Sequence, residues 1–137
     1  MNDEQIDLED GIEPGEALNA ISYTIIGAAV EVHRVLGQGY SELIYQKAME
    51  VELRLRQVGF VAQASVGVMY KGEHLGEGKL DLLVQDQVIV ELKAVDELSP
   101  IHKAQVISYF KATRIKLKLL INFNVRKLKD GIKRIAL

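Results

Sequence analysis

The sequence predicts an α/β fold in which a mixed central β-sheet is flanked by helices. Two observations predict it. In the first part of the chain, apolar residues recur at spacings of three and four, as in amphipathic helices. After Gly59, β-branched runs separated by turn residues replace that pattern, as in strands. The expected order is helix, helix, three strands, helix and two strands, an arrangement that covers a sheet with helices.

The composition fits one soluble domain with its own core. The chain has 137 residues, of which 48% are hydrophobic and 26% charged, and this excludes intrinsic disorder. It has no cysteine, which excludes disulfides, thiolate zinc sites, iron–sulfur clusters and cysteine nucleophiles. Residues 1–15 are acidic and poor in large apolar groups, so we expect a flexible arm there and a single domain over residues 16–137.

Two helices are expected before the sheet. The first begins at Glu16 and ends at Gly37, and the second begins after Ser41, a good N-cap, and ends near Val58. The second helix carries two apolar stripes, so we expect it to lie between two layers. The larger stripe comprises Ile44, Ala48, Val51, Leu55 and Val58. The smaller one comprises Glu42, Tyr45, Met49 and Leu53, and it predicts that Glu42 faces inward.

The strands are predicted by their turns. Lys71-Gly72-Glu73 and Gln85-Asp86-Gln87 are turn sequences between β-type runs, so three strands form a meander. Ser99 and Pro100 are typical of a helix start. The expected elements are strands at residues 60–70, 75–84 and 88–94, a helix at 99–113, and strands at 116–123 and 132–137.

Charged residues inside the apolar strands are the candidate site. Glu91 and Lys93 project from one face of their strand about 7 Å apart. They form either a structural ion pair or a functional site, because an unpaired buried charge is costly. Asp81 lies in the preceding strand and could approach Glu91. Two adjacent carboxylates repel unless a cation or a proton lies between them, and Lys93 would neutralise only one. Oxygen ligands favour Mg²⁺ or Mn²⁺ over zinc.

Four motifs in order resemble a known family. Residues 39–45 read G-x-x-E-x-x-Y, Asp81 follows, Glu91-Leu92-Lys93 comes next, and residues 105–109 read Q-x-x-x-Y. This pattern resembles the GxxExxY protein family of the PD-(D/E)xK nuclease superfamily, over about residues 18–137. The resemblance implies a restriction-endonuclease-like core. Leu80 stands where the superfamily motif has proline, which removes no ligand.

The resemblance also implies roles for individual residues. Asp81 and Glu91 would be metal ligands, with the Leu92 carbonyl as a third. Glu42 would support the metal from its helix, and Lys93 would orient or activate the attacking water. Gln105 and Tyr109 match a motif of exonuclease-like branches and complete the set of candidate catalytic residues.

The function implied by the resemblance is hydrolysis of phosphodiester bonds with Mg²⁺ or Mn²⁺, with DNA favoured over RNA as the substrate. Residues 100–137 carry ten bases and one acid, which are either phosphate contacts or solvated faces. The alternative is a non-catalytic module that binds nucleic acid or protein and keeps the fold. A homodimer is a further candidate partner.

Other features predict location and minor roles. No apolar run approaches the roughly 20 residues of a membrane helix, and the first ten residues are acidic, so we expect no membrane contact and a cytoplasmic location. His33 lies near a helix end and is expected to have a structural or surface role. Tyr45 either fills the core or faces the site.

Overall fold

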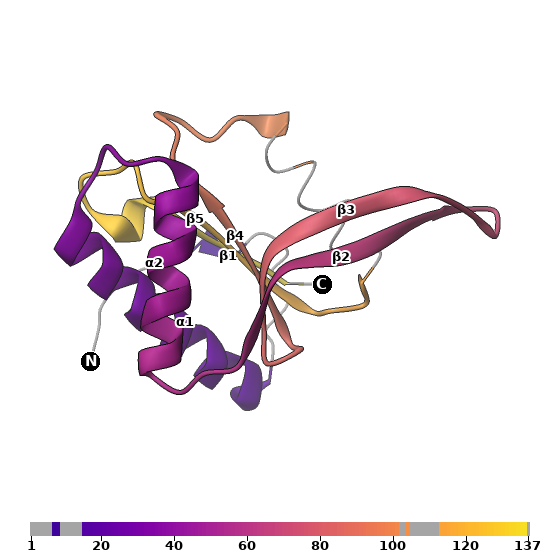
Figure 1. Ribbon diagram of the computed structural model, residues 1–137, viewed down its shortest axis with the longest axis horizontal. Helices are drawn as coiled ribbons and strands as arrows, with labels where there is room; N and C mark the ends of the chain where they lie inside the picture. Colours follow the sequence, from indigo (N-terminus) through magenta and orange to yellow (C-terminus); the bar gives the residue numbers. More distant parts are fainter. Residues whose placement is uncertain (1–6, 9–14, 102–103, 105–112, 137) are drawn as a thin grey trace.

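The computed structural model describes residues 7–8, 15–101, 104 and 113–136, and its mixed sheet with two long helices confirms the predicted α/β class (Figure 1). The helices are α1 (Glu16–Leu36), α2 (Glu42–Leu55) and the short 3-10 helix η1 (Leu128–Gly131). The strands are β1 (Asp7–Leu8), β2 (Phe60–Tyr70), β3 (Glu73–Val84), β4 (Val88–Lys93), β5 (Leu117–Asn122) and β6 (Ile132–Ala136).

The six strands form one sheet in the order β1-β6-β5-β4-β3-β2. Strands β2, β3 and β4 form the predicted antiparallel meander, β5 lies parallel to β4, and β6 lies antiparallel to β5. The two residues of β1 belong to the expected arm, and they pair parallel with β6. The β2–β3 hairpin extends well beyond the rest of the sheet (Figure 1).

Both predicted turns of the meander are confirmed. Lys71 and Gly72 have φ angles of 49° and 84°, and Gln85 and Asp86 have φ angles of 50° and 57°. Paired positive φ values are typical of tight hairpin turns, which fix the register of the strands that they join. The second turn pairs Leu82 with Val90 and thereby makes Asp81 and Glu91 the next opposed positions.

Helices α1 and α2 cover one face of the sheet, and the main core lies between them and the strands (Figure 1). We call this the helix-side core. Its largest fully buried members include Tyr45, Phe123, Ile25, Ile26, Met49, Leu53, Leu82 and Leu92. A second, smaller core lies on the opposite face of the sheet and comprises Val66, Leu80, Ile89, Leu120 and Ile135.

The expected packing of α2 is wrong. Ile44, Val51 and Leu55 of the larger stripe are 42%, 47% and 73% exposed, whereas Tyr45, Met49 and Leu53 of the smaller stripe are fully buried. The helix therefore buries one face and leaves the other in solvent, rather than lying between two layers. Periodicity identifies apolar faces of a helix but does not show which face contacts the sheet. Here the large side chains of the smaller stripe fill the space between α2 and the sheet.

The start of helix α2 agrees with the sequence-based prediction, and its end differs from it. Helix α2 begins as predicted at Ser41, whose Oγ accepts a hydrogen bond from the Ile44 N–H at 3.4 Å. It ends at Leu55, three residues before the predicted end, and Gln57 then adopts a φ of 60°. The expected helix over residues 99–113 falls mostly on residues 102–103 and 105–112, which lie outside the described residues.

Within the described part of the chain, no helix is long and apolar enough to cross a membrane.

Candidate metal centre

Asp81 lies where side-chain hydrogen bonds continue the pairing between β3 and β4. The backbone register runs as far as Leu82 and Val90. Beyond it, the Leu92 N–H donates to Asp81 Oδ2 at 2.8 Å, and the Asp81 N–H donates to Glu91 Oε1 at 3.4 Å. These two bonds orient both carboxylates and place them beside each other. The structure thus brings together the two acids that the strand pattern singled out.

The β2–β3 hairpin is twisted at Asp81, so that residues on either side of Asp81 pack on opposite faces of the sheet. Leu82 packs in the helix-side core, but Leu80, only two positions away, packs in the core on the opposite face. On β2, Gln63 has a φ of 53° between Ala62, which pairs with Leu82, and Ala64, which pairs with Leu80. A local twist of this kind re-aims side chains. Asp81 therefore lies at the point where the hairpin leaves the body of the sheet.

Glu91 projects from the face of the sheet that is turned away from α1 and α2. On β4, Val90 and Leu92 belong to the helix-side core and Ile89 to the opposite core. Since side chains alternate along a strand, Glu91 and Lys93 share the face of Ile89. The predicted common face of Glu91 and Lys93 follows from this alternation.

Glu42 does not join the two acids. It is exposed at the first position of α2, so the expected inward orientation is wrong. In the part of the chain that the structure describes, no group of three or more His, Asp or Glu side chains could hold a metal ion together. The role of Glu42 as a metal ligand stays a prediction. Gln105 and Tyr109 lie outside the described residues.

Lys118 is a site residue that sequence reasoning missed. It lies on β5, pairs in register with Ile89 and is fully buried, and its Nζ is 3.9 Å from Glu91 Oε1. The signal that singles out Asp81, one charged residue inside an apolar run, is also present here, because Lys118 stands between Leu117 and Leu119. The sequence pattern predicts a strand there but does not predict that Lys118 contacts Glu91.

Burial controls the protonation of the Glu91–Lys118 pair. Removal from water raises the pKa of Glu91 to about 7, with a further upward contribution from Asp81, while Lys118 and Lys93 oppose the rise. Removal from water also lowers the pKa of Lys118 to about 8, against the attraction of Glu91 and Asp81. The dry site disfavours both charged forms, and both groups titrate close to neutral pH.

The charge balance differs from the sequence-based expectation. Asp81 and Glu91 are accompanied by two lysines, Lys93 and Lys118, and not by Lys93 alone. A dication is therefore not required to neutralise the acids. The two carboxylates are nevertheless suited to binding a dication, because Mg²⁺ keeps several waters and is commonly held by one or two carboxylates. The two carboxylates, without histidine or cysteine, are ligands that suit Mg²⁺ or Mn²⁺.

The titration of the pair predicts a minimum in stability near neutral pH. Glu91 keeps its proton to about pH 7 in the folded protein but releases it near its ordinary value of 4.5 when unfolded, so its contribution to stability is lost as the pH rises through this window. Lys118, with a pKa lowered from 10.5 to about 8, restores stability as the pH rises from 8 to 10.5. Each change is at most about 1.4 kcal/mol per pH unit.

The measurement is urea unfolding from about pH 4.5 to about pH 10 in the presence of a chelator. The reference is the double variant Glu91→Gln/Lys118→Met, which lacks both titrating groups. We expect the free energy of unfolding of the wild type, relative to the double variant, to be lowest between pH 7 and 8. A difference that does not vary with pH would contradict the assignment.

The backbone beyond Lys93 is held by Asn122. This buried side chain donates from Nδ2 to Val95 O at 2.8 Å, and its Oδ1 accepts from the N–H groups of Val95 at 3.1 Å and Asn124 at 3.2 Å. The Phe123 N–H also donates to Lys93 O at 2.9 Å. These bonds fix the carboxyl end of β4, and with it the backbone of Lys93.

Tyr45 belongs to the core and not to the site. Its ring stacks on Phe123 with centroids 4.6 Å apart, and its hydroxyl donates to Gly37 O at 2.5 Å. It therefore ties the connection between α1 and α2 to the end of β5. His33 has the predicted structural role, because its Nε2 lies 2.7 Å from Val125 O.

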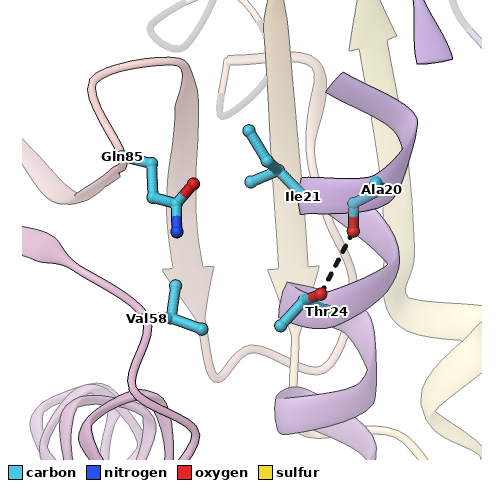
Figure 2. A pocket seen from close by; sticks show the side chains of 5 residues that line it. All are labelled: Ala20, Ile21, Thr24, Val58 and Gln85. Atoms are coloured by element: carbon cyan, nitrogen blue, oxygen red, sulfur yellow. Dashed lines mark hydrogen bonds between the residues drawn. The ribbon is translucent and has the colours of Figure 1, made fainter. Parts of the chain in front are cut away.

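A small pocket lies at the opposite end of β4. It has a volume of about 160 Å³ and is lined by Ala20, Ile21, Thr24, Val58 and Gln85 (Figure 2). The Thr24 hydroxyl donates to Ala20 O at 3.1 Å. None of the five lining residues is charged, so this pocket contributes no acid or base to the candidate centre.

The fold and the site together define an α/β protein with adjacent carboxylates and two lysines on neighbouring strands of a mixed sheet. A family model described as the PD-(D/E)XK nuclease superfamily matches residues 19–135. The chain belongs to this superfamily, and its fold is the restriction-endonuclease-like α/β fold that the sequence predicts. Comparisons with curated proteins and with solved structures return no match to the chain.

Proposed function

We propose that the protein is a nuclease that hydrolyses phosphodiester bonds with Mg²⁺ or Mn²⁺ held by Asp81 and Glu91. Membership of the nuclease superfamily supports the general activity. The observation that carries the proposal is the pair of adjacent carboxylates, each fixed by a backbone N–H from the opposite strand. Such preorganisation means that the ligands need little rearrangement on binding.

Each residue of the site has a proposed task. Asp81 and Glu91 hold the metal with the Leu92 carbonyl, while the Leu92 N–H keeps the Asp81 carboxylate in place. A bound dication supplies charge that activates water and stabilises the leaving oxygen. Lys93, on the same strand face as Glu91, positions the attacking water. Glu42, Gln105 and Tyr109 are proposed to assist, as the resemblance of their motifs implies, and the same motifs lead us to propose that the chain is a member of the GxxExxY family.

The proposed substrate is nucleic acid, with DNA favoured over RNA. Three exposed cations, Arg126, Lys127 and Lys129, follow β5 in the segment that begins beside the end of β4. There Asn124 Nδ2 donates to Asp96 Oδ1 at 2.9 Å and links the two segments. Cations in such a segment can contact phosphates and position a strand without reading its sequence. The absence of cysteine fits the proposed cytoplasmic location.

A second candidate function follows from the charge balance. Because Lys93 and Lys118 can neutralise Asp81 and Glu91, the cluster could be a purely structural ion network. The protein would then be a non-catalytic module that binds nucleic acid or protein. The homodimer considered from sequence stays a prediction.

The experiment is cleavage of labelled single- and double-stranded DNA and RNA with Mg²⁺, with Mn²⁺ and with a chelator. We expect cleavage only with metal, and loss of at least about a hundredfold in Glu91→Gln, because the amide cannot replace a charged ligand. The matched control is Glu73→Gln, the same change at an exposed position in the hairpin. No metal-dependent cleavage of any substrate by the wild type would favour the non-catalytic module.

A further inference from the structure

Lys118 lies on the opposite side of Glu91 from Asp81, one strand away in the sheet. It comes from β5, whereas Asp81 comes from β3 and Glu91 and Lys93 come from β4 between them. The ammonium is fully buried and its Nζ is 3.9 Å from Glu91 Oε1, the oxygen that also accepts from the Asp81 N–H. The proposed reaction gives no task to this charge.

We propose that Lys118 is an internal counter-ion of Glu91 that competes with the dication for this carboxylate and so weakens metal binding. The inference rests on the proposed function, because it concerns the same site. In the metal-free protein the ammonium satisfies Glu91. When a dication binds the same carboxylate, the Lys118 ammonium and the dication both lie beside Glu91 and repel each other. The ammonium must then move away, or the repulsion lowers the affinity for the metal.

The geometry sets the size and the direction of the effect. The Lys118–Glu91 attraction, which a dication at Glu91 must compete with, acts between two unit charges 3.9 Å apart. At an effective dielectric constant near 20, an attraction at about 4 Å can alter an equilibrium by up to about a thousandfold. The flexible four-carbon stem of lysine allows part of the repulsion between the ammonium and the dication to relax. We therefore expect Mn²⁺ to bind at least about tenfold more tightly when the charge of Lys118 is removed. A residue that only aligned Glu91 would give the opposite result, because its loss would weaken binding.

The experiment is calorimetric titration of the full chain with Mn²⁺, together with the melting temperature with and without Mn²⁺. Lys118→Met removes the charge but keeps an unbranched chain of similar length, and Lys118→Gln is a second neutral variant. The matched control is Lys116→Met, which removes the same charge from an exposed position two residues earlier. Relative to the wild type, we expect both Lys118 variants to bind Mn²⁺ more tightly and to show a larger Mn²⁺-induced rise in melting temperature. The control should match the wild type in both measurements.

A variant that is unfolded without metal is expected to refold on addition of Mn²⁺, because the dication then supplies the missing positive charge; failure of both variants to refold would overturn the inference. Equal or weaker binding by folded Lys118 variants would also overturn it, while Mn²⁺ binding by the wild type would leave the proposed function intact. Binding by the variants but not by the wild type would support the inference and contradict the proposed metal use of the wild type. No binding by any of them would remove both.

Discussion

Asp81→Asn is expected to lower metal-dependent cleavage by at least about a thousandfold, equivalent to about 4 kcal/mol of transition-state stabilisation. The amide oxygen can still accept the hydrogen bond from the Leu92 N–H that Asp81 Oδ2 accepts at 2.8 Å, so the local geometry is kept. Only the negative charge is lost, and with it the attraction for a dication. The measurement is the cleavage rate at saturating Mn²⁺, alongside the melting temperature.

Two further variants separate charge from position. Asp81→Ala also removes the hydrogen-bond acceptor of the Leu92 N–H and should cost a further 1 to 3 kcal/mol of stability, roughly. Asp86→Asn is the matched control, because it makes the same chemical change in the β3–β4 turn, at a φ of 57° that asparagine tolerates. Wild-type cleavage by Asp81→Asn would contradict the role of Asp81 as a metal ligand, whatever the stability of the alanine variant.

Local sequence chemistry predicted the strands and the start of the second helix, but not which face of that helix is buried. The two turns contain Gly72 and Asp86, residue types that tolerate positive φ, and they placed the meander correctly. Helix α2 has two apolar stripes, and the choice between them depends on the shape of the sheet that the helix meets. That shape arises from pairings far apart in the chain, so no pattern within the helix shows it.

The contacts within the site differ in the same way, between those made by neighbours in sequence and those made by distant segments. Asp81 and Glu91 lie on strands joined by a tight turn, so their proximity followed from sequence order. Lys118 reaches Glu91 because β5 lies parallel beside β4 after a long crossover, and this neighbour relation is not local. A charge in an apolar strand can be noticed from sequence, but its partner follows only from the strand order.

Tyr45→Ala is expected to lower the free energy of unfolding by about 3 to 5 kcal/mol, the usual cost of truncating a buried aromatic residue. The ring is fully buried and stacks on Phe123 at 4.6 Å, so its loss leaves a cavity between α2 and the end of β5. Tyr45→Phe removes only the hydroxyl that donates to Gly37 O and should cost about 1 kcal/mol. Urea unfolding of the three proteins gives both values.

The phenylalanine variant decides whether the tyrosine of the G-x-x-E-x-x-Y segment has a chemical role. The Tyr45 hydroxyl donates to the Gly37 carbonyl, and the residue belongs to the helix-side core. We therefore expect the Tyr45→Phe protein to cleave nucleic acid at the wild-type rate. Tyr40→Ala is the matched control for truncation, since that ring packs edge-on against Tyr45 but is 49% exposed and should cost less. A large loss of cleavage in a stable Tyr45→Phe protein would instead place this hydroxyl in the reaction, and the core assignment would then explain only part of its role.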